Sequence, residues 1–98
     1  MAEVKLNLDN NGNGVFFILD GGEQVAEMVI RIADQTLIVF HTEVAPAAEG
    51  KGLAKELLAA MVAYARQKSL KVMPLCPYVH AQFKRNPEAY ADLWTSGD

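Results

Sequence analysis

The feature that most constrains the fold is a change in the spacing of apolar residues near the middle of the chain. Residues 36–44 and 70–75 are short, apolar runs with strand-like composition. Between them, apolar residues recur at intervals of three and four, which predicts an amphipathic helix from about residue 52 to about residue 68. Its buried stripe should consist of Ala54, Leu57, Leu58, Met61, Val62 and Ala65. Strand, helix and strand then form a right-handed crossover, so the two strands should lie parallel in one sheet.

The first half of the chain predicts an antiparallel meander. Residues 4–8, 15–19 and 24–32 have strand-like patterns, and turn-forming Asp, Asn and Gly residues separate them. At the other end, residues 79–85 have helical spacing, and a further helix should begin with Asn86 as its N-cap and Pro87 in its first position. The expected fold is α+β, a mostly antiparallel sheet with one parallel strand pair, in a single domain of residues 1–98.

Composition narrows the class of protein. The chain has 98 residues, 51% of them apolar, which is enough for one modest core. Its net charge of −3 argues against a nucleic-acid partner, because phosphate-binding surfaces carry basic patches. One cysteine cannot form a disulfide within the chain, and the sequence shows neither a membrane-length apolar run nor a signal-peptide pattern. We therefore expect a cytoplasmic protein with no membrane partner and no metal site.

The predicted helix begins on two glycines, Gly50 and Gly52, although glycine costs about 1 kcal/mol relative to alanine inside a helix. Free amides at a helix N-terminus form an anion site, and glycines let a phosphate group approach the backbone closely. The alternative is that the glycines only permit a turn after Pro46. Neither the P-loop spacing nor the three glycines of a dinucleotide fingerprint is present. Gly50 and Gly52 alone are compatible with both an anion site and a simple turn.

The context of this turn favours a ligand site. A strand, the segment EGKGLA at residues 49–54 and an amphipathic helix resemble motif A of the GNAT acetyltransferase superfamily, whose pattern is Arg or Gln, two residues, Gly, one residue, then Gly or Ala. Gly52 and Ala54 match the last two positions, whereas Glu49 departs from the first. Residues 41–44, 75–79 and 86–93 further resemble the small, YjdJ-like branch of this superfamily.

The resemblance implies a compact GNAT-like fold that binds acetyl-CoA, with the pantetheine arm between the fourth and fifth strands. Longer members carry additional N-terminal helices, so the resemblance also implies a shortened acceptor region. The side chain at the position of Glu49 contributes less to the family's site than the backbone amides do, and cofactor binding should therefore tolerate the mismatch. The expected cofactor-binding residues are Val44, Glu49, Gly50, Lys51, Gly52, Leu53, Ala54, Tyr78 and Asn86.

Three residues are candidates for catalysis. Histidine ordinarily titrates near pH 6.5, so a residue such as His41 can take a proton from an amine, and the strand period places Glu43 on the same face as a second base. Cys76, at the end of the fifth strand, is a candidate general acid for the departing CoA thiolate or a transient acetyl carrier. The alternatives are a hydrogen-bonded structural histidine, a solvated carboxylate and a buried apolar filler.

The expected function is therefore acetyl-CoA-dependent N-acetyl transfer to a small-molecule or protein amine. A CoA or acyl-CoA binding module without turnover is the alternative, suggested by Glu49 and by the shortened acceptor region.

Overall fold

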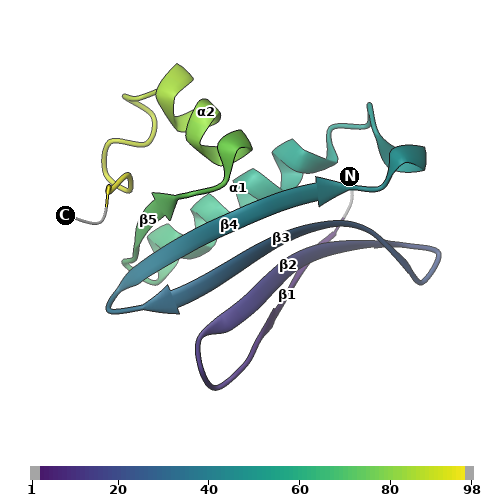
Figure 1. Cartoon of the computed structure of the whole chain (residues 1–98), viewed down its shortest axis with the longest axis horizontal. Coiled ribbons are helices and arrows are strands. Elements are labelled where there is room, and N and C mark those ends of the chain that lie inside the picture. Colours follow the sequence, from purple (N-terminus) through teal and green to yellow (C-terminus); the bar gives the residue numbers. More distant parts are fainter. Residues whose placement is uncertain (1–2, 97–98) are drawn as a thin grey trace.

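The fold of the chain is defined by a computed structural model that describes residues 3–96. Its elements in order are β1 (Val4–Leu8), β2 (Asn13–Asp20), β3 (Glu23–Ala33), β4 (Thr36–Val44), a short 3₁₀ helix (Pro46–Ala48), α1 (Leu53–Gln67), β5 (Lys71–Pro74) and α2 (Pro77–Arg85). The strands form one sheet in the order β1-β2-β3-β4-β5, antiparallel except for the parallel pair β4 and β5 (Figure 1). The α+β fold with one parallel pair is confirmed.

Helix α1 connects the two parallel strands and crosses one face of the sheet (Figure 1). Its apolar stripe is buried as expected, except that Ala54 is only half-buried and Leu53 joins the stripe instead. Each fully buried leucine or methionine of such a stripe contributes about 1.5–3 kcal/mol through burial. On the sheet side, the core is built from alternate strand residues: Phe16, Ile18, Met28, Ile30, Leu37 and Val39.

Strand β4 contains a β-bulge that the sequence pattern does not predict. Val29 of β3 pairs with His41, but the next residue, Ile30, pairs with Val39, so Phe40 is an extra residue without a cross-strand partner in this register. Val39 is buried against the helix layer, as alternation requires. After the bulge the alternation is reversed, and the exposed His41 lies on the opposite face of the sheet.

The C-terminal part corrects two predictions. Helix α2 begins at Pro77, two residues earlier than expected, because proline suits the first helical position. The helix expected from Asn86 onward is absent from the described residues, where 87–93 form successive turns. Asn86 ends α2 instead, donating its backbone N–H to the carbonyl of Gln82.

The turns after α2 are held against the rest of the fold. Arg66 of α1 donates hydrogen bonds to both carboxylate oxygens of Asp92, at 3.0 and 3.1 Å, and to the carbonyl of Ala89 at 2.8 Å. A parallel bridge between Val72 and Trp94 extends the β5 edge of the sheet. These contacts satisfy backbone groups that a helix would otherwise have paired. Within residues 3–96, no helix combines the length and hydropathy needed to cross a bilayer.

Candidate active site

The turn before α1 has the conformation that its glycines suggest. Gly50 and Gly52 have φ angles of +82° and +75°, in the left-handed region that glycine adopts without strain. A Cβ atom added to either residue would meet nothing within 4 Å, so the turn conformation, and not crowding inside the protein, requires glycine. The space beside both residues is therefore open to a ligand.

Gly52 is the N-cap of α1, and among the described residues no side chain caps this helix end. The backbone amides at the start of α1 accordingly face the open turn at the positive end of the helix dipole. Leu53 is buried and anchors the helix start, whereas Glu49 and Lys51 are exposed on the turn. Of the predicted cofactor-binding residues, 49–52 are thus exposed around an uncapped helix N-terminus, whereas Leu53 is buried and Ala54 half-buried.

Strands β4 and β5 separate in front of this turn. Their pairing ends where Val39 lies opposite Pro74, after which the chain leaves β5 and enters α2. A last backbone hydrogen bond, 2.9 Å from the Cys76 N–H to the Val39 carbonyl, marks the point of divergence. Beyond it, residues 41–44 of β4 continue without a β5 partner in the described register. The resemblance predicts the pantetheine arm between these two strands, and this placement stays a prediction.

Cys76 lies at this divergence point and is buried, with 2% of its surface exposed. Its Sγ is 3.4 Å from the Oγ1 of Thr42, a half-buried residue of β4. Tyr78, in the first turn of α2, is also half-buried, and burial raises the pKa of its phenol above the ordinary value of 10.0, with smaller contributions from Tyr90 and Cys76. The phenol therefore remains protonated at neutral pH and can donate a proton.

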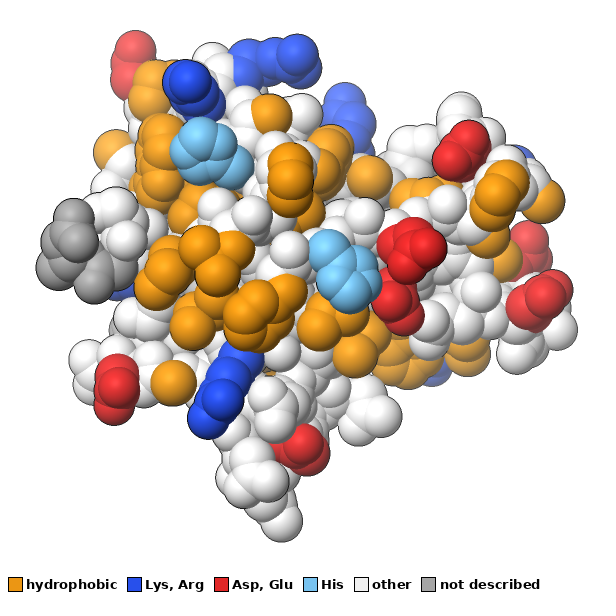
Figure 2. Space-filling model, in the orientation of Figure 1, with side chains coloured by type: hydrophobic (Ala, Val, Ile, Leu, Met, Phe, Trp, Pro, Cys, Tyr) orange, Lys and Arg blue, Asp and Glu red, His pale blue; other side chains and the backbone are white. Residues whose placement is uncertain are grey.

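His41 and Glu43 lie on the other face of the sheet, the one that α1 does not cover. Together with Glu27 of β3 they bring an imidazole nitrogen and two carboxylate oxygens within 4.8 Å of one another, a set of atoms able to bind a cation. One of these contacts joins His41 Nε2 to Glu27 Oε2 at 3.4 Å. In Figure 2 a histidine lies against acidic side chains on this face, beside a group of hydrophobic side chains.

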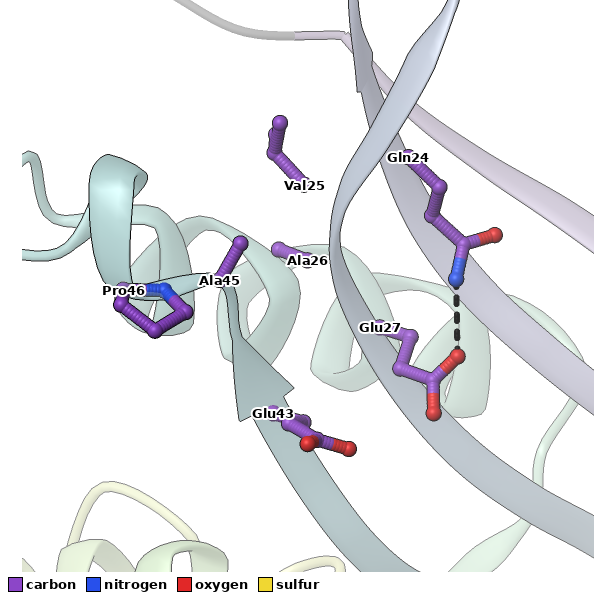
Figure 3. A pocket seen from close by; sticks show the side chains of 7 residues that line it. All are labelled: Gln24, Val25, Ala26, Glu27, Glu43, Ala45 and Pro46. Carbon is purple, nitrogen blue, oxygen red and sulfur yellow. Dashed lines mark hydrogen bonds between the residues drawn. The ribbon is translucent and has the colours of Figure 1, made fainter.

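A pocket of about 340 Å³ adjoins this cluster, between the start of β3 and the end of β4. Glu27 and Glu43 line it from neighbouring strands, with their carboxylates directed toward the same space (Figure 3). The amide of Gln24 donates a 2.8 Å hydrogen bond to Glu27 Oε1. The walls of the pocket are thus negatively charged, which suits a positively charged ligand.

The sites predicted from the sequence consequently fall into two groups on opposite sides of β4. Cys76 and Tyr78 lie near the start of α2, whereas His41 and Glu43 lie on the uncovered face. Asn86 lies away from the Gly50–Gly52 turn, at the C-terminal end of α2, where it lines a larger groove of about 680 Å³ between the two helices. Sequence reasoning missed Glu27 and Thr42, because each is defined by a contact between segments far apart in the sequence. It also missed Gln24, whose role depends on its contact with Glu27.

The family model for GCN5-related N-acetyl-transferases matches residues 15–93, which include the glycine turn, the diverging strands and both groups of candidate residues. The chain belongs to this family. Family membership makes it an enzyme of the acyltransferase class.

Solved structures agree with this assignment. A GCN5-like protein from Staphylococcus aureus, assigned as an N-acetyltransferase, is 26% identical over 100% of this chain and 94% of its own, with a TM-score of 0.69. The ribosomal-protein-S18-alanine N-acetyltransferase of Escherichia coli (15% identity, TM-score 0.62) and an acyl-CoA N-acyltransferase of Klebsiella pneumoniae (23%, 0.62) share the fold. The alignments cover 67% and 81% of this chain, but only 43% and 59% of those two proteins. No curated protein matches the sequence.

Proposed function

We propose that this GCN5-related N-acetyltransferase transfers an acetyl group from acetyl-CoA to an amine. The observation that carries the proposal is the uncapped N-terminus of α1 behind the left-handed turn at Gly50 and Gly52, next to the diverging strands β4 and β5. The amides of this turn would hold the pyrophosphate, as helix N-termini commonly do. Lys51 would add a positive charge, while Glu49 opposes it.

The residues between β4 and β5 would orient the reacting end of the cofactor. When bound, acetyl-CoA supplies the thioester carbonyl that the amine attacks. Val44 and the other residues of β4 beyond Val39, which have no β5 partner, would line the path from the glycine turn to Cys76, and Tyr78 would lie at its inner end. Tyr78 or Cys76 would protonate the departing thiolate, and the raised pKa of Tyr78 keeps its proton available at neutral pH.

The acceptor would approach over the uncovered face of the sheet. The carboxylates of Glu27 and Glu43 attract a protonated amine, and His41 removes the proton that blocks its lone pair. A small-molecule amine and the amine of a protein both fit a pocket that is open to solvent.

We also infer that the protein is of the small YjdJ-like type and cytoplasmic. Support for the first inference comes from the nearly complete mutual coverage with the short S. aureus protein. The single free thiol fits a reducing compartment.

Turnover can be tested directly by incubating the protein with acetyl-CoA and a panel of mono- and diamines while free thiol release is followed. The expected result is amine-dependent release that His41→Ala lowers by about 10²-fold or more, with little change in the affinity for CoA. The matched control is His80→Ala, which removes an exposed histidine on α2. Tight CoA binding without release for any amine would instead establish the binding module suggested by Glu49.

A further inference from the structure

One contact on the uncovered face links two neighbouring strands and involves a residue outside the proposed catalytic set. Glu27 of β3 places Oε2 3.4 Å from Nε2 of His41 on β4. The side chains of Glu27 and His41 are 28% and 53% exposed, respectively, so both groups remain accessible to an acceptor. Glu27 is 14 positions away in sequence, and only the strand pairing brings it to the imidazole.

The carboxylate of Glu27 is held from its other side. The Gln24 amide donates to Oε1 at 2.8 Å, which leaves Oε2 directed toward the imidazole. The contact between Glu27 and His41 also requires the bulge at Phe40, because the bulge turns His41 onto the face from which Glu27 projects. Gln24, Glu27 and His41 therefore form a chain of side chains across two strands.

We propose that Glu27 is a positioning residue for His41, which rests on the proposed role of His41 as the base. A neutral imidazole has one N–H donor and one acceptor nitrogen, and the partner of one nitrogen decides which is which. An ionised carboxylate only accepts, so Nε2 carries the hydrogen and donates it to Glu27. Nδ1 then holds the lone pair that takes the proton of the acceptor amine.

Glu43 is a second carboxylate near His41, within 4.8 Å. It is also an acceptor and would favour the opposite tautomer if it bound the Nδ1–H. The contact to Glu27 prevails in the structure, because Glu27 is the partner within hydrogen-bonding distance and is itself held by Gln24. Thr42 and Cys76 lie on the other side of β4, where they contact each other.

A double-mutant cycle tests this role, because a residue that acts through His41 has no effect once His41 is absent. Glu27→Leu should lower kcat on the order of tenfold and leave the KM for acetyl-CoA unchanged, and Glu27→Gln, whose amide oxygen still accepts, should restore most of the loss. In a His41→Ala background, Glu27→Leu should lower kcat no further, and the loss of its carboxylate from the pocket should then affect only the KM for the amine. Glu23→Leu, which removes an exposed carboxylate from the same strand, is the matched control. Equal losses of kcat from Glu27→Leu in both backgrounds would overturn the proposal.

Nuclear magnetic resonance provides a readout that needs no turnover, and it separates this inference from the proposed function. The chain has two histidines, so the His41 ring signals can be assigned against those of His80. The neutral ring should carry its proton on Nε2 and occupy one side-chain rotamer. Rotamer averaging should appear in Glu27→Leu but not in Glu27→Gln. A proton on Nδ1, or an unchanged rotamer in Glu27→Leu, would refute the positioning role even if the enzyme is active.

Discussion

Thr42 Oγ1 lies 3.4 Å from Cys76 Sγ, and this contact joins β4 to the residue that precedes α2 at the point where the parallel strands part. The adjacent His41 points to the opposite face. Strand β4 therefore separates a buried thiol and hydroxyl from an exposed imidazole and carboxylates. A ligand lying along β4 beyond Val39 would have access to both sets of groups.

The role of Cys76 can be tested by comparing Cys76→Ala with Thr42→Val. Removing a buried sulfur should cost about 1 kcal/mol of the free energy of unfolding and leave the fold intact. If Cys76 is the acid or an acetyl carrier, Cys76→Ala lowers turnover by about tenfold or more, whereas Thr42→Val, which keeps the thiol, does not. Intact mass spectrometry after brief exposure to acetyl-CoA detects the carrier as an acetyl adduct that depends on Cys76. Full activity of Cys76→Ala would leave the residue with a packing role only.

The glycine turn offers a matched pair of substitutions. Gly52 and Gly22 both have positive φ angles and open space beside them, but Gly22 lies in the turn between β2 and β3. Valine should cost about 1–2 kcal/mol at each position, because a side chain disfavours the left-handed region. Only Gly52→Val should also abolish the thermal stabilisation by CoA, since its side chain enters the space beside the α1 amides. Calorimetry showing equal CoA affinity in both variants would move the cofactor site away from this turn.

Tyr78 should make stability depend on alkaline pH. Burial, followed by Tyr90 and Cys76, raises the pKa of its phenol above 10.0 in the folded state. Its contribution is fully present below the ordinary pKa of tyrosine and is lost as pH rises through the higher folded pKa. Urea denaturation at about pH 7 and about pH 10.5 should therefore show a smaller alkaline loss of stability in Tyr78→Phe than in the wild type. Tyr64→Phe, on α1, controls for removal of a phenol elsewhere.

Asp92 should produce the opposite dependence, at acid pH. The hydrogen bonds from Arg66 are the main cause that lowers the pKa of Asp92 below 3.8, and the charges of Arg66 and Lys71 act in the same direction. The stabilisation is present above that value and is lost as pH falls through the lowered folded pKa. Both side chains are exposed, so we expect a small effect on global stability.

The effect of the Arg66–Asp92 pair on the C-terminal turns is easier to measure than its effect on global stability. Trp94, the single tryptophan, packs against Phe83 close to this ion pair. Its fluorescence should shift to longer wavelength in Asp92→Asn at neutral pH and respond to acid less than in the wild type. Identical acid responses of the two proteins would show that the pair does not hold the C-terminal turns.

Much of the fold could be predicted from the spacing of apolar residues. Helix α1 and the strands each bury one face, and this spacing indicates which face is buried. The prediction of a helix from Asn86 onward was wrong. An asparagine followed by proline suits a helix start, but Asn86 also ends the preceding helix. Contacts of Asp92 and Trp94 with distant residues decide the conformation of the turns that follow. The catalytic candidates were predicted by residue type and position. Their division between two sides of β4 was not, because a bulge is a property of the pairing between strands and not of one strand's pattern.

The bulge at Phe40 gives β4 one residue more than its pairing with β3 needs. Because Val39 and His41 already pair with the consecutive residues Ile30 and Val29, a chain lacking Phe40 would keep the inside and the outside of β4 as they are. In the present chain, a register that paired Phe40 with Val29 would exchange the two sides. An imidazole and a carboxylate would then enter the apolar layer, and Thr42 and Val44 would be turned out to water. A homologue can therefore vary or lose this residue, whereas a chain that keeps it must keep the bulge with it.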